Sequence, residues 1–199
     1  MRSEPPALLP IFRSQHQAEM LAVLMLHPNQ DFTLSDLARR LGVPASTLHL
    51  ETQRVVDAGL LTSRQVGRSR LLQANTDNRI VGPLTDLLAA TFGALPVVEE
   101  EFADIPDADM VVIFGSWAAR HAGVAGKAAD DVDVLVLGHP VRGAVYDAAG
   151  RAEARLGYPV NAVVRPIERW TTIGDALIEQ VRASPHVVLH DRTAAGGVS

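Results

Sequence analysis

One stretch of sequence decides the fold of the N-terminal part: residues 32–75, which read FTLSDLARRLGVPASTLHLETQRVVDAGLLTSRQVGRSRLLQAN. Apolar side chains recur at helical spacing over residues 34–41, after a capping Thr33 and before a stop at Gly42. After a turn of only a few residues the same spacing returns in a second helix that ends at Gly59. Two helices joined by so short a turn predict a helix-turn-helix.

The second of these helices has an outward face of hydrogen-bonding side chains around Leu50. Such side chains are long enough to reach base edges and phosphates in a DNA major groove. The pattern is also compatible with a dimerisation or protein-docking unit. The candidate DNA-contacting residues of this helix are Ser46, Thr47, His49, Gln53 and Arg54.

A basic hairpin follows the second helix. Residues 60–74 read as two short strands, and Gly67 permits the positive φ of the turn between them. Arg64, Arg68 and Arg70 gather there, with no acidic residue in the same segment. We expect these arginines to contact phosphates or the minor groove.

The helix end, strand, turn and strand of DAGLLTSRQVGRSRLLQAN are the most characteristic part of this segment. Over residues 17–75 the chain resembles the winged-helix domain of bacterial regulators of the ArsR/MarR type. The resemblance implies a transcriptional regulator that binds double-stranded DNA as a homodimer. An apolar helical stretch over residues 78–98 offers a dimerisation surface through Val81, Leu84, Leu87, Leu88 and Phe92. Alternatively, this helix packs within its own chain.

The C-terminal part contains two strand-like apolar runs with polar residues at their ends. Residues 109–114 lead into Gly115-Ser116, where glycine allows close approach of a phosphate and the serine hydroxyl and backbone amides can donate to it. In the second run, Asp131 and Asp133 point the same way, with Cα atoms roughly 6.5–7 Å apart. Mg²⁺ or Mn²⁺ would satisfy both carboxylates. Alternatively, they lie solvated at the strand start.

Together these features resemble the nucleotidyltransferase superfamily, the fold of DNA polymerase β and of the minimal nucleotidyltransferases of toxin–antitoxin pairs. The resemblance lies in residues 111–138, VVIFGSWAARHAGVAGKAADDVDVLVLG. It implies a nucleoside triphosphate (NTP) whose phosphates contact Gly115, Ser116 and Arg120. It implies catalytic carboxylates at Asp131 and Asp133, which with Asn161 would hold Mg²⁺ or Mn²⁺. Asn161 stands at the third carboxylate position, carries no charge and cannot act as a base, so enzymatic activity stays open.

Composition excludes several classes of protein. The chain has 199 residues, of which 47% are hydrophobic and 21% charged, as in ordinary globular proteins. It has no cysteine, so disulfides, cysteine-bound metals and thiol catalysis are excluded. The net charge of −5 argues against nucleic-acid binding when taken as a whole. It divides, however, into +2 over residues 1–75 and −7 over residues 76–199.

The sequence therefore predicts an α+β protein in four parts. Residues 1–76 form a winged helix-turn-helix domain and residues 77–106 a helical linker. Residues 107–192 form a nucleotidyltransferase-like α/β domain, and residues 193–199 a flexible tail. The apolar runs are shorter than the ~18–20 residues of a spanning helix, and no signal peptide is evident. We therefore expect cytoplasmic residence without a membrane.

Three functions remain open from the sequence. The first is a DNA-binding transcriptional regulator whose second domain binds NTP and Mg²⁺ with weak or no transferase activity. The second is an active nucleotidyltransferase that moves a nucleoside monophosphate from NTP to a hydroxyl of a protein, an RNA or a small molecule. The third is an antitoxin-like protein-interaction module.

Overall fold

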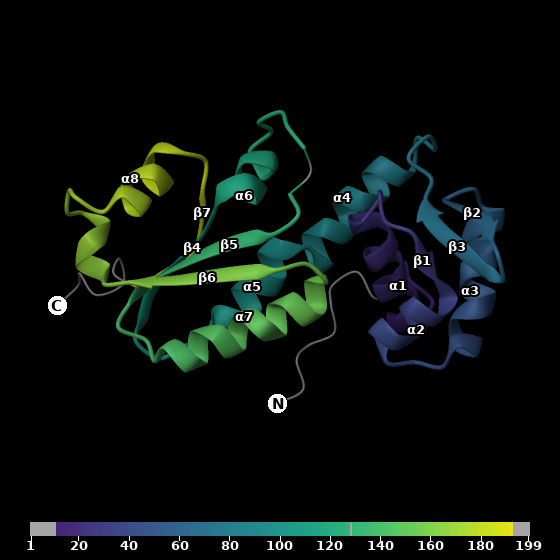
Figure 1. Cartoon of the computed structure of the whole chain (residues 1–199), viewed down its shortest axis with the longest axis horizontal. Helices are drawn as coiled ribbons and strands as arrows, with labels where there is room; N and C mark the ends of the chain where they lie inside the picture. Colours follow the sequence, from purple (N-terminus) through teal and green to yellow (C-terminus); the bar gives the residue numbers. More distant parts are fainter. Residues whose placement is uncertain (1–10, 128, 193–199) are drawn as a thin grey trace. The chain divides into compact units, whose positions relative to one another are not determined.

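The computed structural model describes residues 11–127 and 129–192 (Figure 1). The chain divides into two compact units, Met1–Gly93 and Ala94–Ser199. The tail expected over residues 193–199 lies outside the described residues.

The first unit is built from four helices and a small antiparallel sheet. Its sheet has the strand order β1-β3-β2, in which β2 and β3 form the predicted hairpin. This is the winged helix-turn-helix topology, and it confirms that part of the predicted α+β fold. The elements are α1 (Gln15–Leu26), β1 (Phe32–Thr33), α2 (Leu34–Leu41), α3 (Ala45–Asp57), β2 (Leu61–Val66), β3 (Ser69–Ala74) and α4 (Val81–Phe92).

Local caps fix the helix-turn-helix. The Thr33 hydroxyl accepts from the Asp36 amide at 3.1 Å, and the Asp36 carboxylate accepts from the Thr33 amide at 3.1 Å, which is a capping box. The Thr33 hydroxyl also donates to the Asp36 carboxylate at 2.6 Å, and this bond and the one from the Thr33 amide lower the pKa of Asp36, with Arg39 adding to the effect. Gly42 ends α2 in the left-handed conformation, with φ +64°. The next helix, α3, therefore begins after a short turn, as predicted.

The second unit is a four-stranded mixed sheet with helices on both faces. Its strand order is β6-β5-β4-β7, with β5 and β6 parallel and the other neighbours antiparallel. The elements are α5 (Ala94–Phe102), β4 (Ala108–Phe114), α6 (Gly115–His121), β5 (Val132–Gly138), α7 (Arg142–Leu156), β6 (Val160–Arg165), the 3-10 helix η2 (Ile167–Trp170), α8 (Ala176–Ala183) and β7 (Val187–Asp191).

Strand alternation divides this unit into two apolar layers. On one face Val111, Val134 and Val136 pack with α5 and α7. On the other face Leu135 and Leu137 pack with α8 and η2. Figure 1 shows α7 on one side of the sheet and α8 on the other. By alternation, Asp133 belongs to the row of Leu135 and Leu137, at the beginning of β5.

The segment expected as a linker is divided between the units instead. The first helix, α4, packs on α1 and buries Val81 and Leu88, which were assigned to a dimer surface. The second helix, α5, packs on α7 and buries Val98 and Phe102. The segment expected as a linker over residues 77–106 is divided after Gly93, because each helix carries enough apolar surface to join a core.

Residues 81–102 also bear on the expectation that no segment could span a membrane. By length and composition this helical stretch of 22 residues is apolar enough to do so. Core helices meet the same criterion, and both ends of this stretch contribute buried side chains to the two units.

Candidate functional site

The outward face of α3 is accessible along its length. Leu48, Thr52 and Val55 are buried against the first unit, as the spacing predicts. The opposite side leaves Ser46, Thr47 and His49 exposed, and Leu50 lies among them with 59% of its surface accessible. This face therefore combines short polar groups with one large apolar side chain.

Two of the predicted contact residues on α3 are already engaged within the chain. The Gln53 amide oxygen accepts from Arg70 at 2.7 Å, and its nitrogen donates to Asp57 at 2.7 Å. Arg54 donates to Glu51 at 2.7 Å. Their polar ends must leave these partners before they can reach a base edge or a phosphate.

The arginines of the hairpin do not form one cluster. The register pairs Gln65 with Arg70 and Arg64 with Leu71, so the alternating strands place Arg64 and Arg70 on opposite faces. Arg64 pairs with Asp31 at 2.6 Å, an acid outside the hairpin. Arg68 lies exposed in the two-residue turn, after Gly67 with φ +58°.

Arg70 connects the hairpin to α3. Besides its bond to Gln53, its guanidinium donates to the Ser63 hydroxyl at 3.2 Å. The contact holds the wing at a defined place beside the outward face of α3. The Arg64–Asp31 pair has both side chains partly exposed, so it contributes at most about 1 kcal/mol and a phosphate can displace it.

In the second unit the candidate carboxylates gather at one end of the sheet. There β4 ends beside the beginning of β5, with Phe114 opposite Asp133, and the second residue of β6, Asn161, also lies opposite Asp133. The Asn161 amide nitrogen donates to Asp131 at 3.0 Å and to Asp133 at 3.3 Å. The three predicted residues are therefore brought together, with the amide between two carboxylates.

Gly115 lies directly against Asp133. It has φ +74°, and a Cβ at this position would collide with Asp133 Oδ2 and stand 3.2 Å from its Cγ. Burial raises the pKa of Asp133, the hydrogen bond from Asn161 lowers it and the charge of Asp131 raises it, for a net increase. Glycine is thus needed both for the backbone conformation and for the space that the carboxylate occupies.

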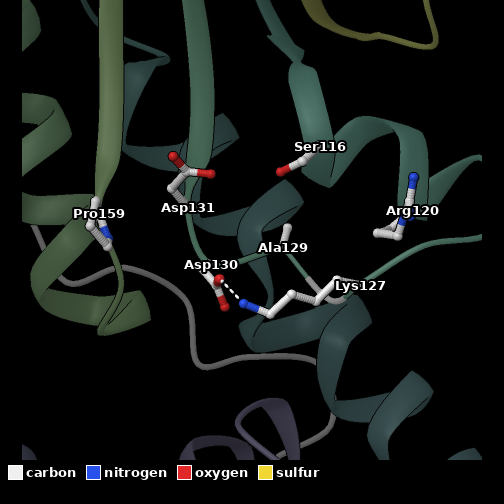
Figure 2. A pocket seen from close by; sticks show the side chains of 7 residues that line it. All are labelled: Ser116, Arg120, Lys127, Ala129, Asp130, Asp131 and Pro159. Carbon is white, nitrogen blue, oxygen red and sulfur yellow. Dashed lines mark hydrogen bonds and ion pairs between the residues drawn. The ribbon is translucent and has the colours of Figure 1, made fainter.

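A cavity of about 590 Å³ opens beside this group. Its size suits a small organic ligand. Figure 2 shows the Ser116 hydroxyl turned toward Asp131, and Lys127 paired with Asp130 at 2.6 Å. The cavity is lined by Ser116, Arg120, Lys127, Ala129, Asp130, Asp131 and Pro159.

Arg120 is held differently from Lys127. Its guanidinium packs so closely on Gly126 that a Cβ there would stand 2.6 Å from Arg120 Cζ. Its Nε is buried and has no hydrogen-bond partner among the described residues. Sequence reasoning selected Ser116, Arg120 and Asp131 for this site but missed Asp130 and Pro159, whose place depends on the loop before β5 and the approach to β6.

The possible metal ligands at this end of the sheet include few carboxylates. No group of three or more His, Asp or Glu side chains that could hold a metal occurs in the part of the chain that the structure describes. Asp131 and Asp133 provide two carboxylates, and Asn161 provides an amide. Two carboxylates and an amide oxygen suit one hard divalent cation, but they lack the third carboxylate of a two-metal site.

Comparison with known proteins gives fold neighbours for part of the chain. No protein-family profile matches the sequence, and no curated protein matches it. One similar solved structure is MepR, a transcription regulator of the Staphylococcus aureus multidrug efflux pump MepA, with 15% identity and a TM-score of 0.36. The match covers 42% of this chain and 60% of MepR.

A second similar structure is a homodimeric winged helix-turn-helix DNA-binding domain from Mycobacterium bovis, described as a possible ArsR-family transcriptional regulator. It has 15% identity and a TM-score of 0.30, and the match covers 45% of this chain and 88% of that domain. The winged-helix topology of the first unit rests on its own helix order and sheet.

Proposed function

We propose that the chain is a DNA-binding transcriptional regulator and that its first unit binds double-stranded DNA as part of a homodimer. The observation that carries the proposal is the exposed face of α3 beside a wing held in place by Arg70 and tipped with Arg68. A helix of this kind fits the major groove, while a basic wing reaches the adjoining backbone. This function places the protein in the cytoplasm.

Salt dependence of duplex binding tests this proposal. The affinity of the wild-type protein for a 30-base-pair duplex is measured by fluorescence anisotropy over a series of salt concentrations. Each lost phosphate contact reduces the salt slope by about 1, so Arg64→Ala and Arg68→Ala together, which leave the Arg70 contacts of the wing intact, should lower both affinity and slope. Arg142→Ala, an exposed change in the second unit, is the matched control. Equal slopes for the double variant and the control would contradict the proposal.

We further propose that the second unit is a nucleotidyltransferase-like domain that binds an NTP with Mg²⁺ or Mn²⁺ and has weak or no transferase activity. The sheet order and the gathering of Asp131, Asp133 and Asn161 support this assignment. Arg120, Lys127 and Ser116 line the cavity, the first two with positive charge. Gly115, directly before Ser116, would complete the phosphate corner.

Charge balance makes the cation necessary for this ligand. The cavity is lined by two basic side chains and by two acidic ones, Asp130 and Asp131. A third carboxylate, Asp133, accepts from the same Asn161 amide as Asp131. A triphosphate would meet this group of carboxylates unscreened, so we expect it to bind only with a divalent cation. Asp131 and Asp133 would hold that cation, joined by the carbonyl of Asn161 once its amide turns over from the two carboxylates to which it now donates; the cation would neutralise phosphate charge.

Two measurements separate binding from catalysis. Calorimetric titration with ATP and GTP should give a heat of binding with Mg²⁺ and none with EDTA, and Asp131→Asn with Asp133→Asn should abolish it. Pyrophosphate release should be slow or absent, because Asn161 cannot supply the third carboxylate. Rapid release that depends on Asp131 would instead establish an active transferase. Nucleotide binding unaffected by the double variant would refute the site.

A further inference from the structure

On the face of α3 that the proposed function directs to DNA, the most prominent side chain is Leu50. The helix advances about 100° per residue, so Leu50 lies roughly 200° from the buried Leu48 and points away from the core. It is 59% exposed and has Thr47 and Arg54 as its neighbours one turn away on either side. An apolar side chain thus stands at the centre of the face, where direct base contacts are made.

The two longest polar side chains around Leu50 have partners within the chain. Both ends of the Gln53 amide are bonded, to Arg70 and Asp57, and the guanidinium of Arg54 is bonded to Glu51. What remains for base edges from this part of the helix is the Leu50 side chain, the exposed His49 ring about 100° around the helix, and the short hydroxyls. Leu50 is the large apolar side chain among them.

Only one base edge offers an apolar partner in the major groove. The C5-methyl group of thymine projects there, whereas the other edges present hydrogen-bond donors and acceptors. We infer that Leu50 is a specificity-determining residue that packs on a thymine methyl and gives the protein a preference for T·A pairs at the centre of its half-site. The inference rests on the proposed DNA binding, and it identifies which base feature α3 reads.

The test varies the methyl group alone. The full-length protein is titrated into a 24-base-pair alternating d(AT) duplex and into the same duplex with deoxyuridine in place of thymidine. Losing one buried methyl group corresponds to about a fourfold weaker binding, so the wild-type protein should bind the deoxyuridine duplex about fourfold less tightly for each half-site that it occupies. The reverse substitution, 5-methylcytosine for cytosine in an alternating d(GC) duplex, should strengthen binding.

Two variants assign the effect to Leu50. Leu50→Ala should bind the thymidine and deoxyuridine duplexes equally, because the side chain that contacts the methyl group is gone. Val66→Ala is the matched control, since Val66 is an exposed apolar residue of the wing (48% exposed), and it should keep the fourfold discrimination. Because both residues are exposed, neither change empties the core.

The outcomes separate the inference from the function on which it rests. If the wild-type protein binds the duplexes with a clear salt slope but does not distinguish thymidine from deoxyuridine, the inference is wrong and DNA binding stands. The inference is equally wrong if Leu50→Ala keeps the discrimination, since the methyl effect would then come from DNA shape. If no duplex binds, the proposed function fails and Leu50 belongs to a protein-docking face.

Discussion

Replacing Gly115 by alanine should destabilise the second unit through a specific collision. The residue lies at the end of β4 with φ +74°, and an added Cβ would meet the carboxylate of Asp133. The Asp133 side chain must then rotate, and it would lose the 3.3 Å hydrogen bond that it accepts from Asn161. The substitution therefore disturbs both the backbone and the candidate site.

The expected loss of unfolding free energy in Gly115→Ala has two contributions. An L-residue in the left-handed conformation costs about 1–2 kcal/mol, and the lost hydrogen bond at the carboxylate costs about 1 kcal/mol more. Gly115→Ala should therefore lower the free energy of unfolding by about 2–3 kcal/mol. Gly123→Ala is the matched control, because Gly123 also has a left-handed backbone, with φ +80°, but nothing lies within 4 Å of its added Cβ. It should cost only the backbone contribution, about 1–2 kcal/mol.

Tryptophan fluorescence reports this unit selectively. The two tryptophans of the chain, Trp117 and Trp170, both belong to the second unit. In urea titrations the wild type should have the highest denaturation midpoint, Gly123→Ala a lower one and Gly115→Ala the lowest. The dependence of the unfolding free energy on urea concentration should be similar in all three. Equal midpoints for the two variants would show that the Asp133 contact contributes nothing, and the account of Gly115 as a support for the carboxylate would be refuted.

Three further predictions concern stability and the metal. Thr33→Ala should weaken the start of α2 by about 1 kcal/mol, seen as faster hydrogen exchange of the first α2 amides. In the wild type the folded pKa of Asp36 lies below its ordinary value of 3.8. The stabilisation by the capping box is therefore complete above pH 3.8 and is lost as the pH falls through the folded pKa. Burial would raise the pKa of Glu101, but hydrogen bonds from Arg155 and Arg151 outweigh it and lower the pKa. Glu101→Gln should therefore cost the second unit about 1–2 kcal/mol at pH 7, and the difference from wild type should shrink as the pH falls below 4.5 through the folded pKa, as followed by tryptophan fluorescence. Asn161→Asp should destabilise the metal-free second unit by about 1–3 kcal/mol, since two donated hydrogen bonds are replaced by a third carboxylate. Mn²⁺ should restore the stability of the variant, and calorimetry should show that the variant binds Mn²⁺ more tightly than the wild type does. No gain in Mn²⁺ affinity would show that Asn161 does not occupy a ligand position.

Local sequence signals predicted many elements closely. Thr33, Asp36 and Gly42 define α2 because caps and stops act within one helical turn. The positive φ of Gly67 defines the wing turn in the same way. The two faces of β5 follow from alternation, so Asp133 was correctly separated from the buried valines. These features depend on residues close in the chain, and the sequence therefore contains enough information to place them.

Contacts between distant segments could not be predicted in this way. Asp31 neutralises Arg64 from 33 positions away, and Arg70 reaches Gln53 across 17. The predicted linker was divided because burial against α1 or α7 depends on which surface is available in three dimensions.

By itself, the amino-acid sequence determined the helix-turn-helix, the wing, the strands, and the uncharged side chain at Asn161. Only the tertiary structure decided which arginines have internal partners and that the Asn161 amide lies between Asp131 and Asp133. The physical reason is range: capping and alternation act over a few residues, whereas partners across a sheet or between elements depend on register and packing of the whole unit.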